Sequence, residues 1–322
     1  MGKSLTTFGL EHLDTCIDEE LKRSRDIIDV LDAAIPEECR VCKGLLNTAQ
    51  QEAFDAIMDY IHSSKPGAFF IDGPGGTGKT FLYNALYAEL RLMGEIVLPT
   101  ATSGITASNI PSGRTTHSRF KIHIDCDVSL ACDVPKQSIL AALIVATSLI
   151  IWDEALMAKR QNVESLDILL RDLCDSNQLF GGKVVVFSGD FRQTLLILPR
   201  RLQREVIEAS LVSSPIWPKL IKFKLTGNIR AQTDPEFASF LLSLGNGALQ
   251  TKESEYIRLP DGMVRATVNG GPDTISELAK LAFPELDDES FDSDIFTTRA
   301  ILTPLNDDVD AINNVLIEKF PG

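Results

Sequence analysis

The segment Gly73-Pro-Gly-Gly-Thr-Gly-Lys79-Thr80 constrains the fold of this chain more than any other feature. It fits the pattern G-x-x-x-x-G-K-[ST], whose glycines let backbone N–H groups close around an anionic ligand because no side chain blocks the approach. A short apolar run, 68–72, precedes it, and apolar residues at helical spacing, 81–90, follow it. A strand, this loop and the start of a helix are the arrangement that the pattern requires. The sequence therefore predicts a loop that binds a nucleoside triphosphate.

The residues of this loop have distinct expected roles. Lys79 is expected to reach the β- and γ-phosphates, and the Thr80 hydroxyl to hold Mg²⁺. A guanine-specific switch protein would need an N/T-K-x-D string, and the sequence contains none, which argues against that alternative. The other nucleotide-binding positions that we expect in the loop are Gly73, Gly75, Gly76, Thr77 and Gly78.

Apolar runs of strand length alternate with helical patterns through the middle of the chain. They lie near 68–72, 96–101, 148–152, 184–188 and 221–226. This alternation predicts an α/β fold with a mainly parallel sheet covered by helices on both faces. Because such sheets bind ligands beyond the carboxyl ends of their strands, the polar residues that follow each run are the functional candidates.

An acidic pair, Asp153 and Glu154, ends one of these runs. Asp153 is expected to hold Mg²⁺ together with Thr80, and Glu154 to polarise the attacking water. Gln193, after the next run, is a candidate sensor of the γ-phosphate. Arg230, after the last run, is a candidate to neutralise charge in the transition state.

Two polar segments lie between the loop and the acids. Thr102 and Ser103 follow a strand and open a helix, so they offer hydroxyls and free N–H groups to a phosphate backbone. Arg114 and His117 belong to a stretch that combines cations, hydroxyls and Phe120, the ingredients of a path for single-stranded nucleic acid. Ordinary loop polarity is the alternative interpretation of either segment alone.

Composition sets only wide limits on function. Net charge is −14 over 322 residues, which argues against a nucleic-acid partner, yet 191–231 carries eight Lys and Arg against two Glu. The longest apolar run, 139–152, is too short to span a bilayer. Cys39 and Cys42 form a lone C-x-x-C without the second ligand pair that a zinc site needs. We expect a soluble, intracellular protein with reduced thiols and no membrane contact.

The two ends of the chain differ from its middle. Apolar residues at helical spacing near the N-terminus predict an amphipathic segment, for packing or for a partner contact. After an irregular acidic stretch, a strand at 299–303 and a helix capped by Asn306 open a second unit. The predicted division is 1–44, a helical segment; 45–248, an ATP-binding domain; 249–298, an acidic connection; and 299–322, the start of a second domain.

In this order the motifs resemble those of the Pif helicase family (petite integration frequency), which are relatives of the RecD-type helicases. The resemblance covers about 45–316, and its most specific string is Gly189-Asp-Phe-Arg-Gln193. Leu46-Asn-Thr-Ala-Gln50 is similar to the adenine-reading Q motif, with Gln50 in the contact position. The other segments that resemble family motifs are 102–105 and 114–120 (DNA backbone), 152–157 (acidic pair), 225–230 (arginine finger) and 300–306 (opening of the second domain).

The resemblance implies a RecA-like domain that binds ATP and Mg²⁺, followed by the start of a truncated second RecA-like domain. It implies 5′-to-3′ movement on single-stranded DNA and unwinding at duplex junctions, in DNA repair, recombination and telomere maintenance, hence nuclear residence. The family's remaining second-domain motifs have no counterpart before Gly322. The alternative is a truncated ATP-binding remnant or interaction module without unwinding activity.

Overall fold

The computed structural model describes residues 33–123, 130–193, 202–249, 251–252, 256–264, 272–284, 298–303 and 305–318. The chain divides into two compact units between Ala248 and Leu249. The first unit carries every predicted site residue. The amphipathic pattern predicted near the N-terminus falls mainly on residues 1–32, which lie outside the described residues.

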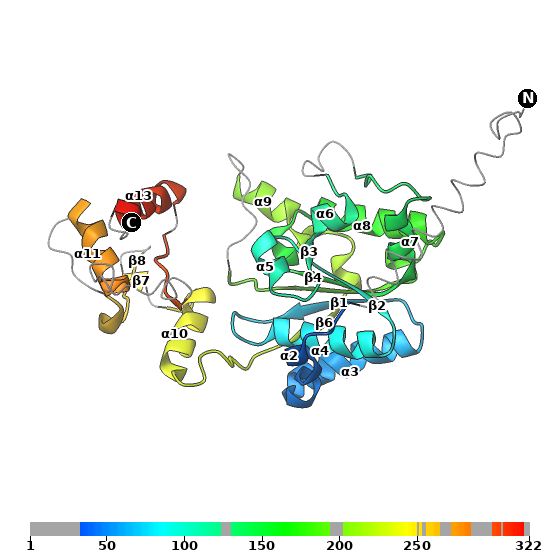
Figure 1. Cartoon of the computed structure of the whole chain (residues 1–322), viewed down its shortest axis with the longest axis horizontal. Helices are drawn as coiled ribbons and strands as arrows, with labels where there is room; N and C mark the ends of the chain where they lie inside the picture. The colour runs from blue at the N-terminus through cyan, green and yellow to red at the C-terminus, as the bar shows by residue number, and fades with distance from the viewer. Residues whose placement is uncertain are drawn as a thin grey trace, which may run out of the picture. The chain divides into compact units, whose positions relative to one another are not determined.

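A six-stranded sheet forms the centre of the first unit (Figure 1). Its order is β3-β2-β4-β5-β1-β6, and every neighbouring pair is parallel, which confirms the predicted α/β fold. Parallel neighbours need a crossover connection, and helices or helical turns supply it here. The strands are β1 Gly67–Asp72, β2 Ile96–Ala101, β3 Arg114–Thr115, β4 Thr147–Asp153, β5 Val184–Gly189 and β6 Ile221–Lys224.

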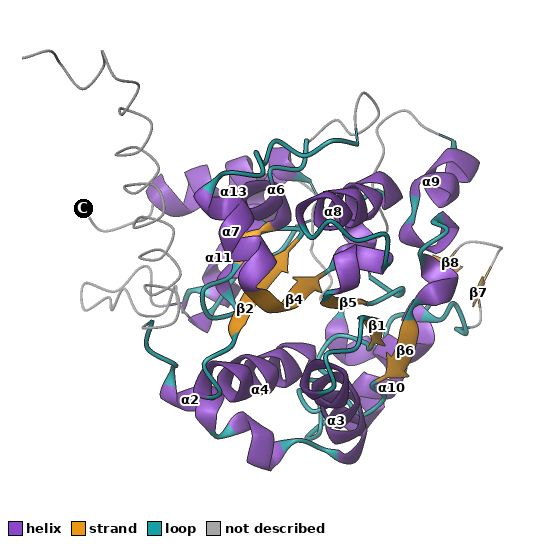
Figure 2. Cartoon of the chain, turned by 90° about the vertical axis from the view of Figure 1, so that its right-hand side faces the viewer, coloured by secondary structure: helices purple, strands orange, loops and turns teal. Residues whose placement is uncertain are grey.

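Helices cover both faces of this sheet (Figure 2). Successive strand residues point to opposite faces, so Phe69 and Ile71 pack with α3 and α4 while Phe70 packs into the core that includes α7 and α8. Burial on both sides explains why the strands are continuous apolar runs rather than alternating ones. The longer helices of this unit are α3 Thr48–His62, α4 Lys79–Leu92, α7 Ile139–Ala146, α8 Arg160–Leu173, α9 Gln203–Ala209 and α10 Pro235–Gly245.

Shorter helical turns connect these elements. Two of them follow strands at the edge that carries the predicted site residues: α5 after β2 and α6 after β3. The short elements are α2 Glu37–Arg40, η2 Cys42–Leu45, α5 Gly104–Ser108, α6 Thr116–Phe120, η3 Ala155–Met157, η4 Leu179–Gly182, η5 Leu211–Ser213 and η6 Trp217–Lys219.

The second unit contains more helix than the sequence predicted. Its described elements are β7 Thr251–Lys252 and β8 Tyr256–Ile257, which pair antiparallel, η7 Asp261–Met263, α11 Pro272–Ala282 and α13 Asn306–Glu318. The acidic stretch was predicted to be irregular, but α11 lies within it. Ile275, Leu278, Ala279 and Ala282 have the spacing of one helix face, a signal that the acidic composition obscured.

The predicted strand at 299–303 is wrong, because these residues have no regular secondary structure. The apolar run Ala300-Ile-Leu302 has strand character, but Leu302 is 92% exposed rather than buried. A strand also needs a neighbour to bond its backbone groups, and no described residue pairs with this segment. The helix expected after it is present as α13, beginning at Asn306 itself.

Cys39 and Cys42 are both buried beside α4. Burial, Cys42 and Glu38 raise the pKa of Cys39 to about 11, and burial and Glu38 also raise the pKa of Cys42. Among the described residues, no group of three or more His, Cys, Asp or Glu side chains is placed to hold a metal ion.

Within the described ranges, no helix combines the length and the apolar character that crossing a membrane requires.

Candidate active site

Apart from Gln50, which lies in α3, the predicted site residues lie at or after the ends of strands that finish at the same edge of the sheet, because parallel strands end together. A cavity of about 570 Å³ lies at this edge. Phosphate-loop, acidic, glutamine and arginine candidates from four segments all line it. The lining residues are Gly75, Gly76, Thr77, Gly78, Lys79, Thr80, Asp153, Glu154, Gln193 and Arg230, joined by Leu45, Phe81, Thr106, Asn109 and Ile229.

The glycine loop is shaped as an anion cradle. Gly76 and Gly78 have φ of +85° and +79°, in the left-handed region that favours glycine. A Cβ on Gly76 would stand 2.5 Å from the Asn228 amide oxygen, and one on Gly78 would stand 2.4 Å from Gln50 Nε2. The Lys79 ammonium donates to the Gly73 carbonyl at 2.7 Å. A buried lysine at the start of α4 with open space before it fits a triphosphate.

Gln50 supports the loop from behind. Its Nε2 donates to the carbonyls of Thr77 and Gly78 at 3.1 and 3.3 Å, and its Oε1 accepts the Asn47 N–H at 2.9 Å. Gln50 is fully buried and does not line the cavity. Its carboxamide is thus engaged within the protein, and adenine recognition by Gln50 stays a prediction that requires these bonds to exchange.

Asp153 and Glu154 differ in backbone conformation and in their hydrogen bonds. The Asp153 carboxylate is oriented through Oδ1, which accepts the Ser188 hydroxyl at 2.6 Å and the Glu154 N–H at 3.0 Å. Glu154 has φ 53° and ψ 39°, a left-handed conformation that is uncommon outside glycine, asparagine and aspartate. Burial and the carboxylates of Asp153 and Asp190 raise the pKa of Glu154, against the opposing charge of Lys79. A carboxylate with a raised pKa suits proton abstraction from water.

Asp190 is a functional candidate that the sequence analysis missed as an individual residue. Its Oδ2 accepts the Gly75 N–H at 3.1 Å, and its Oδ1 accepts the Arg192 N–H at 3.0 Å. The Arg192 guanidinium lies 3.3 Å from the same Oδ1 and 3.6 Å from Asp72 at the end of β1. Because Asp190 belongs to the family-specific string that ends in Gln193, the signal was present in the sequence.

The segment after β6 lies directly on the glycine loop. The backbone N–H groups of Ile229 and Arg230 both donate to the Gly76 carbonyl, at 2.8 and 3.3 Å. The Asn228 side chain accepts the Ala231 N–H at 3.0 Å and so closes the turn. These bonds bring Arg230 to the cavity from a position about 150 residues further along the chain.

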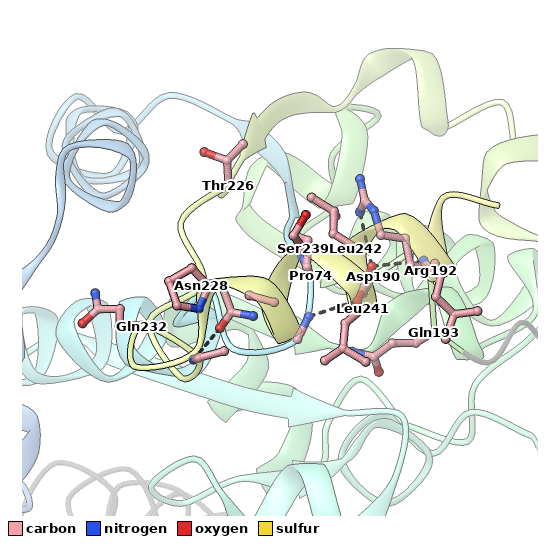
Figure 3. Close-up of a pocket in the computed structure, with 16 residues that line it drawn as sticks. Pro74, Asp190, Arg192, Gln193, Thr226, Asn228, Gln232, Ser239, Leu241 and Leu242 are labelled. Atoms are coloured by element: carbon pink, nitrogen blue, oxygen red, sulfur yellow. Dashed lines mark hydrogen bonds and ion pairs between the residues drawn. The ribbon is translucent and has the colours of Figure 1, made fainter. Parts of the chain in front are cut away.

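A second cavity of about 570 Å³ lies between the glycine loop, the segment after β5 and α10 (Figure 3). Asp190, Arg192 and Gln193 form its polar side, and Leu241 and Leu242 of α10 its apolar side. Gly75 and Gln193 line both cavities.

The four predicted DNA contacts gather at the β2–β3 end of the same edge, where Thr100 pairs in register with Arg114. Arg114 is exposed, whereas Arg119 is buried and its guanidinium donates to the Ser112 carbonyl at 3.1 Å. Burial, and then the charge of Arg114, lower the pKa of Arg119 to about 10. The His117 ring bonds the Ile122 carbonyl at 3.0 Å. Ser103 caps α5 by accepting the Thr106 N–H.

Thr102 differs from the other three predicted DNA contacts, because both its backbone N–H and its hydroxyl are bonded to the segment that carries Asp153 and Glu154. Thr106 of α5 and Asn109, which caps the end of α5, line the cavity at the glycine loop, and the sequence analysis did not foresee this. The nucleotide-binding candidates and the predicted DNA contacts therefore adjoin each other at α5.

The chain is similar to known helicases. A family model described as PIF1-like helicase matches residues 45–255, more than half of the chain. An ATP-dependent DNA helicase PIF1 of Trypanosoma brucei is 27% identical over 76% of this chain, and one of Saccharomyces cerevisiae 27% over 85%. These alignments span 24% and 28% of the relatives' own lengths.

Solved structures show the same fold. The Pif1 helicase of Candida albicans matches with a TM-score of 0.59 and 21% identity, over 86% of this chain and 55% of that one. The Bacteroides Pif1 helicase in complex with ADP-AlF3 and ssDNA matches with a TM-score of 0.56 and 22% identity, over 83% and 56%.

The raised pKa of Glu154 predicts that ionising this carboxyl costs folding free energy. Glu154→Gln should therefore raise the free energy of unfolding at about pH 8 without metal. The gain should shrink as pH falls through the raised pKa and vanish below the ordinary value near 4.5. Denaturant unfolding followed by tryptophan fluorescence reports on this unit, because Trp152 and Trp217, the only tryptophans, lie in it.

Glu52→Gln is the matched control, since Glu52 is exposed on α3 and its replacement should change stability by less than about 0.5 kcal/mol at either pH. A Glu154→Gln protein that is less stable than the wild type at about pH 8 would contradict the assigned burial cost.

Proposed function

The chain belongs to the PIF1-like helicase family, and we propose that it is the ATP-hydrolysing motor portion of a DNA helicase. The observation that carries this proposal is the single cavity lined by the glycine loop, both acids, Gln193 and Arg230. These residues come from four segments far apart in the sequence, and they combine phosphate binding, metal binding and proton abstraction in one place.

In the proposed mechanism, Lys79 exchanges its bond with the Gly73 carbonyl for the β- and γ-phosphates. Thr80 and Asp153 hold Mg²⁺, which neutralises charge on the phosphates when it is bound. Glu154 accepts a proton from the attacking water, a role that its raised pKa and partial burial favour. Gln193 senses the γ-phosphate, and Arg230 stabilises the charge that develops on the transferred group.

Single-stranded DNA is the proposed partner of the β2–β3 end of the edge. The exposed Arg114 and the α5 cap at Ser103 support contact with a phosphate backbone. The Bacteroides relative named above was crystallised with single-stranded DNA. We extend this to unwinding at duplex junctions with 5′-to-3′ movement; work in nuclear repair, recombination and telomere maintenance stays a prediction from the resemblance.

Two measurements on variants test the nucleotide roles. Lys79→Ala should lower ATP turnover by about 100-fold or more, because it removes a charge that stabilises the transition state. Glu154→Gln should lower turnover by a similar factor yet retain ATP binding, measured by titration calorimetry, since Glu154 acts on water. Unchanged turnover in Lys79→Ala would overturn the loop assignment, and wild-type turnover in Glu154→Gln would overturn the assignment of the base.

Replacing Arg114 and His117 together by Ala should weaken binding of a single-stranded oligonucleotide. The slope of log affinity against log salt should also become shallower, by about 0.7 for each phosphate charge that the variant no longer neutralises. His62→Ala with Lys65→Ala is the matched control: these exposed residues lie at and just after the end of α3, before β1 and at the opposite edge of the sheet. Equal affinities and slopes in both double variants would remove the proposed DNA path.

A further inference from the structure

Thr102 lies between the acidic segment and the loops proposed to contact DNA. Its hydroxyl donates to the Glu154 carbonyl at 2.7 Å and accepts the Trp152 indole N–H at 3.0 Å. Its backbone N–H donates to the Asp153 carbonyl at 3.1 Å. Thr102, which directly follows β2, thus bonds three consecutive residues at the end of β4: Trp152, Asp153 and Glu154.

These bonds use both donors that Thr102 has. A hydroxyl carries one O–H, and a residue carries one backbone N–H. Phosphate oxygens only accept hydrogen bonds, so Thr102 can donate to a DNA phosphate only by releasing Glu154 or Asp153. A DNA contact by Thr102 therefore stays a prediction that requires one of these bonds to exchange, in contrast to the exposed Arg114.

The residue held by Thr102 is in an uncommon conformation. Glu154 has φ 53°, where a side chain with a Cβ is disfavoured and persists only if its surroundings hold it. The Glu154 N–H donates to Asp153 Oδ1 and its carbonyl accepts the Thr102 hydroxyl, so the backbone is held on both sides. The direction of the Glu154 carboxylate follows from this backbone conformation.

We propose that Thr102 is a positioning residue that fixes Glu154 in its left-handed conformation and links the proposed DNA path to ATP hydrolysis. The link is short: Ser103, the next residue, caps α5, and Thr100 pairs with Arg114 in β3. If DNA binding shifts the end of β2, the Thr102 hydroxyl would transmit the shift to the backbone of Glu154. We call the hydrogen bonds of Thr102 to Trp152, Asp153 and Glu154 the tether. The positioning role rests on the proposed function, whereas the tether itself does not.

Thr102→Val and Thr102→Ser separate the hydroxyl from the shape of the side chain. Val keeps the shape and removes both hydroxyl bonds, so kcat for ATP at saturating oligonucleotide should fall roughly 10- to 100-fold, as for a misplaced catalytic group. The KM for ATP and the Kd for oligonucleotide should stay at wild-type values. Ser keeps the hydroxyl and should restore kcat.

Thr100→Val is the matched control. The Thr100 hydroxyl also donates from β2 to a β4 carbonyl, that of Ile151 at 2.7 Å, but it does not touch Glu154. If removal of such a bond acted only through stability, both Val variants would have the same kcat. We expect a low kcat in Thr102→Val and a near-normal kcat in Thr100→Val.

The NMR resonance of the Trp152 indole N–H reports on the tether independently of ATP hydrolysis. The chain has two tryptophans, so Trp152→Phe assigns the signal by its disappearance. The resonance should move in Thr102→Val and not in Thr100→Val. Should Thr102→Val fail to fold because the buried indole lacks an acceptor, the double variant Thr102→Val with Trp152→Phe removes that donor and should show the same low kcat.

Three results would overturn the proposal. An unmoved Trp152 resonance in Thr102→Val removes the tether. A moved resonance with wild-type kcat removes the positioning role. Weakened oligonucleotide binding with unchanged kcat at saturating DNA makes Thr102 a DNA contact after all. If the wild type hydrolyses no ATP, the proposed function fails together with the positioning role, while the tether still stands or falls on the resonance.

Discussion

The parallel register of six neighbouring strands is the constraint on which the rest of the structure depends. It sends the carboxyl ends of all strands to one edge, so that segments after β1, β4, β5 and β6 meet around one cavity. The sheet can be wholly parallel because helices bury both of its faces. The apolar runs that build the sheet and the polar residues that follow them are therefore two consequences of one architecture.

The glycine loop is held in shape by residues from three other segments. Asp190 accepts from Gly75, the backbone after β6 donates to Gly76, and Gln50 donates to Thr77 and Gly78. Each bond uses a backbone group of the loop that glycine leaves accessible. The segments after β5 and β6 that bond the loop also deliver Gln193, proposed to sense the γ-phosphate, and Arg230, proposed to stabilise charge on the transferred group.

The sequence predicted the loop, the acids and the sheet because each depends on local patterns: a glycine spacing, an apolar run and a residue at its end. It did not predict that Gln50 and Thr102 are engaged within the protein, since hydrogen-bond partners 27 and 52 residues away leave no local signal. It likewise missed the left-handed Glu154, whose backbone groups bond Asp153, Met157 and the distant Thr102. The strand predicted at 299–303 failed for the same reason, as strand formation depends on a partner.

Steady-state ATP hydrolysis by the purified chain, with and without a single-stranded oligonucleotide, tests the central claim most directly. Lys79→Ala serves as the blank for contaminating activity. We expect hydrolysis above the blank that rises strongly with oligonucleotide, because the proposed DNA path and Glu154 lie at the ends of the neighbouring strands β2 and β4. Hydrolysis that is weak and indifferent to DNA would contradict it, and would indicate instead a nucleotide-binding unit that does not couple DNA contact to turnover.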